Sequence, residues 1–248
     1  MSSLINRLVA WISLRTRIRN LAVRLLFPVP RRPRAAPSWA TYDGTPFCSD
    51  AALSSADVLS WAPAQLTRAD RLLLYTLVFT LRPLRYLEVG TLRGGSALIA
   101  AAAMDALQTP GRIICVDSNP QISPEHWRLI EHRATLVKGT SPNVLPKAAE
   151  AAQGLLDLVF IDGSHSFGCV VSDAMGVLPH MTDGAYILFH DSFCPDVRDG
   201  IDAFVASQGG AVVDFGSLNR EFTLDPRTGP AQWSGIRMVQ IRRRIRAA

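Results

Sequence analysis

The chain has 248 residues, of which 48% are hydrophobic and 19% are charged, and this composition excludes a wholly disordered protein. The net charge of +5 is unevenly distributed: eight arginines and no acidic residue precede Asp43, so the rest of the chain carries −3. This mildly acidic body argues against nucleic-acid binding. The four cysteines form no C-x-x-C pair, which indicates reduced thiols in a cytoplasmic protein.

Residues 1–40 are predicted to be a basic extension that precedes one folded domain over residues 41–248. Within the extension, residues 3–27 predict an amphipathic helix, because leucines and a tryptophan recur at helical spacing between arginines. No apolar run is long enough to cross a bilayer, and no signal-peptide cleavage site follows one. The helix could lie peripherally on the anionic inner face of a membrane, pack on another subunit of a homo-oligomer, or lack order. The proline-rich segment Pro28–Pro37 is predicted to be an extended linker.

The folded body predicts strands that alternate with helices. A first helix is expected over Thr67–Leu81, with Thr67 as N-cap and Asp70 completing an approximate capping box. Apolar strands are expected at Leu84–Val89, Arg112–Asp117, Ala134–Lys138, Leu158–Asp162, Ala185–His190, Ala211–Phe215 and Ile236–Ile241. Helices are expected at Gly95–Leu107, Pro124–His132, Pro142–Ala152, Ser166–Leu178 and Asp196–Ser207. This pattern predicts a mainly parallel sheet covered on both faces, with its ligands at the carboxyl ends of the strands.

The first strand runs directly into a glycine-rich turn and an alanine-rich helix. Gly90 allows a sharp reversal, and Gly94 and Gly95 let the backbone approach a ligand at the helix N-terminus. The dinucleotide fingerprint G-x-G-x-x-G fails here, because its second glycine is replaced by Leu92. The carboxylate of Glu88 would repel a pyrophosphate and would suit a ligand with a positive end. The turn therefore favours S-adenosylmethionine over NAD.

The stretch Glu88-Val-Gly-Thr-Leu-Arg-Gly-Gly-Ser96 resembles the first motif of class I S-adenosylmethionine-dependent methyltransferases. It is most similar to the form found in metal-dependent catechol-type O-methyltransferases and in bacterial O-methyltransferases of sugars and natural products. The similarity continues through most of Arg82–Val205, about half of the chain. It implies a Rossmann-like class I methyltransferase fold with a C-terminal hairpin at one sheet edge. It also implies that the cofactor contacts Glu88, Gly90, Thr91, Gly94, Ser96, Asp117, Ser118, Gly139, Thr140, Ser141 and Asp162.

Two later strand ends extend the predicted cofactor site. Asp117 ends the second strand, where an acid can accept hydrogen bonds from both ribose hydroxyls; the alternative is a turn or helix-cap aspartate. The segment Gly139–Ser141 matches the part of the family that lies along the adenine. Pro142 replaces the polar residue often found there, which removes one adenine contact.

The fourth and fifth strands end in acids that predict a metal and catalytic site. In the metal-dependent relatives, the residues that match Asp162, Asp191 and Ser192 hold a divalent cation, although Ser192 replaces the usual amide or acid. Oxygen ligands of this kind suit Mg²⁺ better than zinc. His165 matches the catalytic base, which is a lysine in the catechol enzymes, while His190 is an alternative ligand or base. Each acid could instead belong to a turn or a helix cap.

We therefore expect an O-methyltransferase that moves the methyl group of S-adenosylmethionine to a hydroxyl of a small molecule or glycan, assisted by a divalent cation. The acceptor is expected to contact the loops Ser192–Asp199 and Gly216–Gly235, with Arg198, Arg220, Trp233 and Arg237 as candidate contacts. One alternative is a non-haem iron oxygenase that uses His165, Asp162 and His190 as a facial triad. The other is a non-catalytic membrane-associated binding protein with the same fold.

Overall fold

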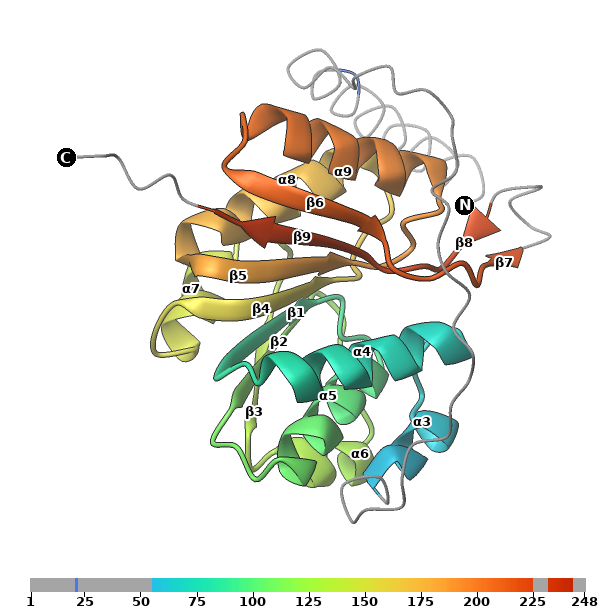
Figure 1. Ribbon diagram of the computed structural model, residues 1–248. Coiled ribbons are helices and arrows are strands. Elements are labelled where there is room, and N and C mark those ends of the chain that lie inside the picture. Colours follow the sequence, from blue (N-terminus) through green and yellow to red (C-terminus); the bar gives the residue numbers. More distant parts are fainter. Residues whose placement is uncertain (1–20, 22–54, 225–231, 243–248) are drawn as a thin grey trace, which may run out of the picture.

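The computed structural model describes residue 21, residues 55–224 and residues 232–242 (Figure 1). The predicted basic helix at 3–27, apart from residue 21, and the linker after it lie outside the described residues. Their contact with a membrane or another subunit, and the domain boundary at residue 40, therefore stay predictions. Among the described helices, none has the length and hydropathy needed to cross a bilayer.

A seven-stranded sheet forms the centre of the described fold. Its strands lie in the order β3-β2-β1-β4-β5-β9-β6. Strands β1 to β5 are parallel, whereas β9 pairs antiparallel with both β5 and β6. The strand bounds are Arg85–Val89 (β1), Arg112–Asp117 (β2), Ala134–Lys138 (β3), Leu156–Ile161 (β4), Met181–Phe189 (β5), Val212–Ser217 (β6) and Arg237–Ile241 (β9). The predicted Rossmann-like sheet is confirmed.

Two details of the sheet differ from the sequence prediction. Strand β5 begins at Met181 rather than Ala185, because an irregularity in its pairing with β4 lets Met181 pair with Leu156. The final antiparallel pair lies at the predicted edge, but it is not a tight hairpin. A second small sheet of β7 (Thr223–Leu224) and β8 (Gln232–Trp233) stands between β6 and β9 along the chain.

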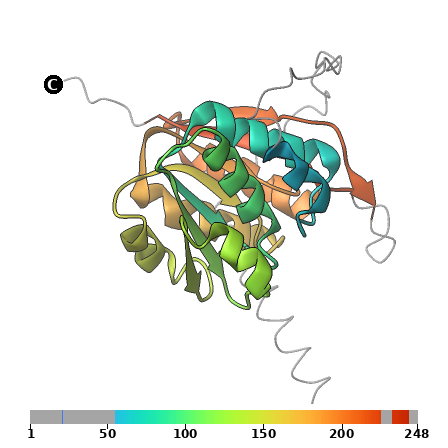
Figure 2. The same ribbon diagram turned by 90° about the horizontal axis from the view of Figure 1, so that it is seen from below.

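Helices cover both faces of the sheet, as predicted. Figure 2 looks at the molecule from the side that carries α4 and α5. The bounds are Val58–Trp61 (α3), Arg68–Leu81 (α4), Gly95–Ala106 (α5), Pro124–Ile130 (α6), Leu145–Ala151 (α7), Phe167–Val177 (α8) and Pro195–Ser207 (α9), with short 3-10 turns at Ser55–Asp57 and Leu178–His180. Helix α7 begins three residues later than expected, after a turn in which the Leu145 N–H donates to the Pro142 carbonyl.

The alternation of side chains along β1 divides the core into two layers. Leu87 and Val89 pack with α7, α8 and α9, while Tyr86 packs on the opposite face with α4 and α5. All three side chains are buried, as expected for a central parallel strand that is covered on both sides. The carboxyl end of β1 is therefore held between two apolar layers, and the turn that follows it has a fixed position.

The glycines of this turn are required by neighbouring protein backbone. A Cβ atom on Gly90 would lie 2.0 Å from the Asp162 carbonyl oxygen, and one on Gly95 would lie 2.2 Å from the Ala64 nitrogen. The sequence prediction attributed the freedom of Gly95 to the approach of a ligand. The structure corrects this reason, because the segment Pro63–Leu66 packs directly on Gly95 and itself lines the cavity described below.

The Arg71 side chain holds that segment in place. Its guanidinium donates to the carbonyl oxygens of Leu66 (3.1 Å) and Leu59 (3.1 Å), and to those of Ala62 (2.8 Å) and Ala64 (2.6 Å). One planar cation on α4 therefore binds four carbonyls between residues 59 and 66, two of them in the segment Pro63–Leu66 and two in or directly after α3.

We expect Arg71→Met to lower the free energy of unfolding by roughly 2 kcal/mol, because hydrogen bonds from a charged donor are lost and partly buried carbonyls remain unsatisfied. Chemical denaturation of the purified protein measures this change. Arg68→Met, at an exposed position of the same helix, should change stability by less than about 0.5 kcal/mol. Equal effects of the two substitutions would show that the carbonyl contacts of Arg71 add nothing.

Candidate active site

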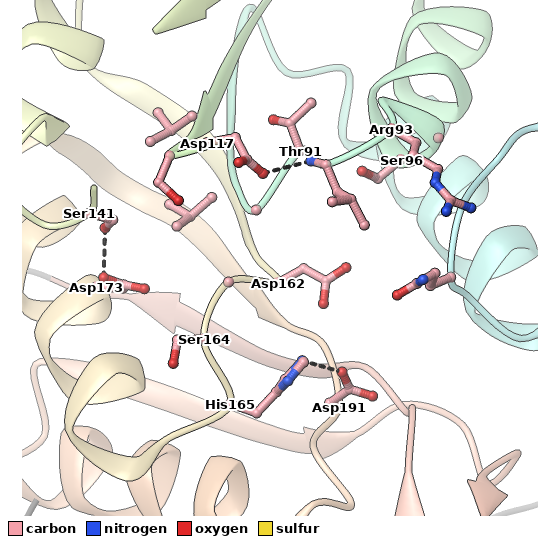
Figure 3. A pocket seen from close by; sticks show the side chains of 18 of the residues that line it. Thr91, Arg93, Ser96, Asp117, Ser141, Asp162, Ser164, His165, Asp173 and Asp191 are labelled. Atoms are coloured by element: carbon pink, nitrogen blue, oxygen red, sulfur yellow. Dashed lines mark hydrogen bonds and ion pairs between the residues drawn. The ribbon is translucent and has the colours of Figure 1, made fainter. Parts of the chain in front are cut away.

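A cavity of about 360 Å³ opens at the carboxyl ends of β1, β2 and β4 (Figure 3). It lies where the strand order reverses between β1 and β4, the usual position of ligand sites in open α/β sheets. Four strand-end segments supply much of its lining: 89–96, Val116–Ser118, Gly139–Ser141 and 162–165. The segment Pro63–Leu66 closes one side, and Cys169, Asp173 and Asp191 add single side chains.

The cavity brings together most of the residues predicted to bind the cofactor. Its lining includes Gly90, Thr91, Ser96, Asp117, Ser118, Gly139, Thr140, Ser141 and Asp162. Two of the predicted residues, Glu88 and Gly94, are not part of the lining. Gly94 instead packs on Ile122, whose side chain would lie 3.2 Å from an added Cβ atom.

Glu88 lies below the glycine-rich turn, on the α4–α5 side of the sheet. It is fully buried, and the Tyr86 hydroxyl donates to its Oε2 at 3.4 Å, while the side chains of Thr91 and Ser96 also hydrogen-bond to the carboxyl. Burial raises the pKa of this carboxyl to about 7. Glu88 is not among the residues that line the cavity, and its contact with the cofactor stays a prediction.

Asp117 organises the turn that surrounds the cavity. Its Oδ2 accepts a hydrogen bond from the Leu92 N–H at 2.7 Å, and its Oδ1 accepts one from the Asn119 N–H at 2.7 Å. Leu92 has φ = 44°, a left-handed conformation that is costly for this residue type and is held here by the bond to Asp117. The carboxylate keeps further lone pairs, so the turn role of Asp117 and a ribose contact are compatible.

Asp173 is a cavity residue that the sequence reasoning missed. It lies on α8, it is 3% exposed, and its Oδ1 accepts a hydrogen bond from the Ser141 hydroxyl at 2.6 Å. It thereby joins the loop after β3 to the helix after β4. One feature of the sequence could have identified Asp173: it is an acid on the otherwise apolar face of a predicted helix, where acids are rarely buried without a partner.

The predicted catalytic residues meet at one end of the cavity. The His165 Nε2 lies 2.7 Å from the Asp191 Oδ2, and ligand atoms of Asp162, His165 and Asp191 all lie within 4.8 Å of one another. Burial by itself would lower the pKa of His165, but the hydrogen bond and charge of Asp191 raise it above its usual value. The same contact, together with His190, holds the pKa of Asp191 well below its usual range against the opposing effect of burial.

His190 lies behind this pair in a cage of three carboxylates. Its Nδ1 is 2.9 Å from the Asp162 Oδ1 and 3.2 Å from the Asp191 Oδ2, while its Nε2 is 3.3 Å from the Asp70 Oδ2. The side chain is 2% exposed. Burial would lower the pKa of His190, but the charge of Asp162 and the bonds to the carboxylates raise it well above its usual value. Both ring nitrogens are engaged, so the structure does not support an iron site built on His165, Asp162 and His190.

Asp70 is the second residue that the sequence reasoning missed as part of the site. The predicted Thr67 cap is confirmed, because the Asp70 N–H donates to the Thr67 Oγ1 at 3.1 Å. The Asp70 side chain, however, is fully buried against His190, and its Oδ1 accepts a hydrogen bond from the Asn219 Nδ2 at 2.7 Å. Burial would raise the pKa of Asp70, but His190 and Asn219 lower it. The sequence explained Asp70 as part of a helix cap, so it gave no reason to predict its contact with His190.

Two candidate contacts in the predicted metal and acceptor regions are placed elsewhere. The Ser192 hydroxyl lies 3.2 Å from the Ser217 hydroxyl and does not line the cavity, so its role as a metal ligand stays a prediction. Arg237 is buried in ion pairs with Asp202 and Asp214 and cannot hold an acceptor.

Trp233 is the predicted acceptor-loop residue that the structure brings next to the catalytic pair. Its ring centroid lies 5.0 Å from that of His165 in an edge-on arrangement. Trp233 belongs to the small sheet of β7 and β8, and the neighbouring Ser234 N–H donates to the Asp191 Oδ1. The second predicted acceptor loop therefore reaches the catalytic end of the cavity.

Residues 87–192, which include most of β1, all of β2 to β5 and most of the residues that line the cavity, match a family described as a methyltransferase domain. This part of the chain is therefore similar to a methyltransferase domain. The match includes the glycine-rich turn, Asp117, the His165–Asp191 pair and His190, which gives this geometry a family context. No protein of curated function matches the sequence.

Several solved structures have a fold similar to that of this chain. The O-methyltransferase TomG of Streptomyces achromogenes, in complex with SAM, is 18% identical with a TM-score of 0.56, over 79% of this chain and 92% of that one. The O-methyltransferase of Bacillus cereus, in complex with SAH, is 18% identical with a TM-score of 0.53, over 80% of this chain and 94% of that one. At 18% identity, these comparisons show that the folds are similar and nothing more specific.

The buried carboxyl of Glu88 makes stability depend on pH. Its pKa is about 7 in the folded protein against an ordinary 4.5, so the folded state binds the proton more tightly than the unfolded state. This contribution is fully present below the unfolded pKa and is lost as pH rises through about 7. We expect Glu88→Gln to be more stable than the native protein at pH 8, by up to roughly 3 kcal/mol, with no gain near pH 4.5.

Urea denaturation at the two pH values measures this difference. Glu150→Gln, at an exposed position of α7, is the matched control and should leave the pH dependence unchanged. A Glu88→Gln protein that is destabilised to the same extent at both pH values would contradict a protonated Glu88 in the fold.

Proposed function

We propose that this protein is an O-methyltransferase that transfers the methyl group of S-adenosylmethionine to a hydroxyl of a small molecule or glycan. The observation that carries the proposal is the position of the His165–Asp191 pair, which lines the same cavity as the glycine-rich turn and Asp117. A cofactor site and a proton acceptor are thus adjacent within a methyltransferase domain. The SAM-bound TomG structure and the SAH-bound structure from Bacillus cereus support the choice of cofactor.

The cavity lining suggests how the cofactor would lie. Asp117 would accept hydrogen bonds from the ribose, as acids at this strand end do in related sheets. The adenine would lie along Gly139–Ser141, in front of Asp173, and Asp162 would face the positively charged sulfonium at the other end. Attractive charge pairs of this kind favour the sulfonium cofactor over its neutral product.

The acceptor hydroxyl would lose its proton to His165. Asp191 holds one ring nitrogen and orients the imidazole, while the second ring nitrogen would take the proton. The acceptor oxygen would then form a bond to the methyl carbon as the bond from that carbon to sulfur breaks, leaving S-adenosylhomocysteine. Placing the two reacting groups side by side would supply much of the rate enhancement.

Trp233 supports a ring-shaped acceptor. Its edge-on packing beside His165 puts an aromatic surface next to the proposed base, where a phenol or a sugar ring could pack. The exposed Phe222 and the ring of Phe193 pack against each other nearby along the same loop system, with ring centroids 6.4 Å apart. Both proposed acceptor classes, phenols and glycans, fit such a surface.

We further propose that Asp162 and Asp191 hold a divalent cation, with Mg²⁺ as the preferred ion. The donor set fits in kind and spacing, because the two carboxylates are oxygen donors whose ligand atoms lie within 4.8 Å of one another and of His165, the proposed base. Such an ion would lower the pKa of the acceptor hydroxyl when bound. The same carboxylates already contact His190, so the cation would share them with that side chain.

We expect His165→Ala to lower kcat by roughly 10²–10⁴, the usual effect of losing a general base, while affinity for S-adenosylhomocysteine stays within about twofold. Turnover is measured as transfer of the labelled methyl group from S-adenosylmethionine to a panel of phenols and cell-envelope glycans. Affinity for S-adenosylhomocysteine is measured by calorimetry. His180→Ala, in the 3-10 turn before β5 at the opposite end of the sheet, is the control. Full activity of His165→Ala would assign the proton to another group. Cofactor binding without turnover on any acceptor would favour the non-catalytic alternative.

The cation requirement has its own test. We expect a chelator to abolish turnover and added Mg²⁺ to restore it, whereas Asp191→Asn should resist rescue because a ligand oxygen is lost. Turnover that is unchanged in excess chelator would remove the metal from the reaction and leave His190 as the positive partner of both carboxylates.

A further inference from the structure

Three aromatic side chains lie around the catalytic end of the cavity. The ring centroid of Trp233 lies 5.0 Å from that of His165, and Phe193 follows Asp191 by two residues. The ring of Phe193 packs nearly at right angles to that of Phe222, with centroids 6.4 Å apart. None of the three belongs to the cavity lining that the described residues form. Phe193, Phe222 and Trp233, which we call the aromatic group, therefore extend the site beyond His165 and Asp191.

Backbone contacts bring the segments of Phe193 and Trp233 together. The Ser192 N–H donates to the Gly235 carbonyl at 3.1 Å, and the Phe193 N–H donates to the Ser234 carbonyl at 3.2 Å. A Cβ atom on Gly235 would lie 2.5 Å from the Phe193 ring, so this ring packs directly against the backbone that follows Trp233. The position of Phe193 beside the small sheet is therefore set by backbone that has no side chain in the way.

The aromatic group continues into an exposed apolar surface. Thr223 pairs with Trp233 in the small sheet, and the residues on either side of Thr223 are Phe222 and Leu224. Phe222 is 46% exposed and Leu224 is 59% exposed. Figure 1 shows β7 and β8 on the side of the molecule toward which β4 and β5 run, the side on which the cavity opens. Apolar side chains that cluster on a surface beside a cavity are typical of a ligand-binding site.

The hydroxyl groups next to these rings are already paired. Each member of the aromatic group has a serine or threonine beside it in the sequence, at positions 192, 223 and 234. The Ser192 hydroxyl lies 3.2 Å from the Ser217 hydroxyl, and the Thr223 hydroxyl lies 3.2 Å from the Ser234 hydroxyl. The surface offered to a ligand is therefore mainly apolar. A polar group that packed on the two phenylalanines would lose hydration without gaining a hydrogen bond from them.

We propose that the aromatic group and Leu224 bind an apolar substituent of the acceptor, namely a second ring or an alkyl chain attached to the ring that carries the reacting hydroxyl. This inference rests on the proposed function and adds the chemical class of the rest of the acceptor. The hydroxyl would lie beside His165, and the apolar substituent would extend past Trp233 toward Phe222. Each buried methylene group strengthens binding by about fourfold, so a substituent of a few carbons determines which acceptors are used.

Two phenols that differ only in an apolar substituent test this proposal. Phenol and 4-hexylphenol carry the same hydroxyl, and calorimetry in the presence of S-adenosylhomocysteine measures the affinity of the full chain for each. We expect 4-hexylphenol to bind at least about tenfold more tightly, because part of its chain is buried against the aromatic group. Phe222→Ala should remove most of this preference and leave the affinity for phenol within about twofold. Phe222→Leu keeps an apolar side chain and should retain most of the preference.

An exposed ring elsewhere on the molecule supplies the control. Phe215 on β6 is 39% exposed and packs with Tyr186, so Phe215→Ala should leave both affinities unchanged. The inference fails if the native protein binds 4-hexylphenol no more tightly than phenol, if it binds neither, or if Phe222→Ala and Phe215→Ala weaken binding equally. Methyl transfer to an unsubstituted phenol or to a glycan would in that case leave the proposed function standing, whereas no transfer to any acceptor would remove it.

Discussion

A buried histidine among three carboxylates holds the catalytic end of the cavity together. His190 contacts Asp70 through one ring nitrogen and both Asp162 and Asp191 through the other, at distances between 2.9 and 3.3 Å. A charge that has lost its hydration is stable only when it is paired and hydrogen-bonded, and removing one partner of such a group is strongly destabilising. The protonated ring and its carboxylates therefore constrain one another. The positions of Asp162 and Asp191 follow from this balance.

The cage also joins parts of the chain that are distant in sequence. Asp70 belongs to α4, Asp162 and Asp191 follow β4 and β5, and Asp70 receives a hydrogen bond from Asn219 in the segment before β7. The segment between β6 and β7 is thus tied to the ends of β4 and β5 through buried polar contacts. Because each contact is made in a low-dielectric interior, a shift of one element alters the hydrogen bonds of the others.

The hydrogen-bonded register of the sheet determines how the residues at its strand ends are placed relative to one another. Its hydrogen bonds continue past the strand ends, from the Gly90 N–H to the Val116 carbonyl, from the Asp162 N–H to the Val89 carbonyl, and from the His190 N–H to the Ile161 carbonyl. Turn residues on neighbouring strands are therefore spaced like residues of the sheet itself. Asp191 leaves this register with φ = 53°, a left-handed conformation that turns its carboxylate toward His165 and the Ser234 N–H.

Much of the architecture could be predicted from the sequence, because its signals are local. Apolar strands that alternate with amphipathic helices specify a covered parallel sheet, and residues that end parallel strands must meet at one edge. The stretch from Glu88 to Ser96 and the acids Asp117, Asp162 and Asp191 could be identified for this reason. The boundaries were less well determined: β5 begins four residues before the predicted Ala185, where pairing with β4 rather than side-chain pattern decides the start.

Only the tertiary structure decided the partners of the polar side chains. The sequence predicted Asp70 to be part of a helix cap, but the fold also buries its side chain against His190. The sequence predicted Arg237 to contact the acceptor, but the fold buries it between Asp202 and Asp214. It likewise placed the Ser192 hydroxyl beside that of Ser217 and left Glu88 outside the cavity lining. The physical reason is that residue type determines which charges need a partner. Which partner comes within hydrogen-bonding distance depends on how elements far apart in the chain pack together.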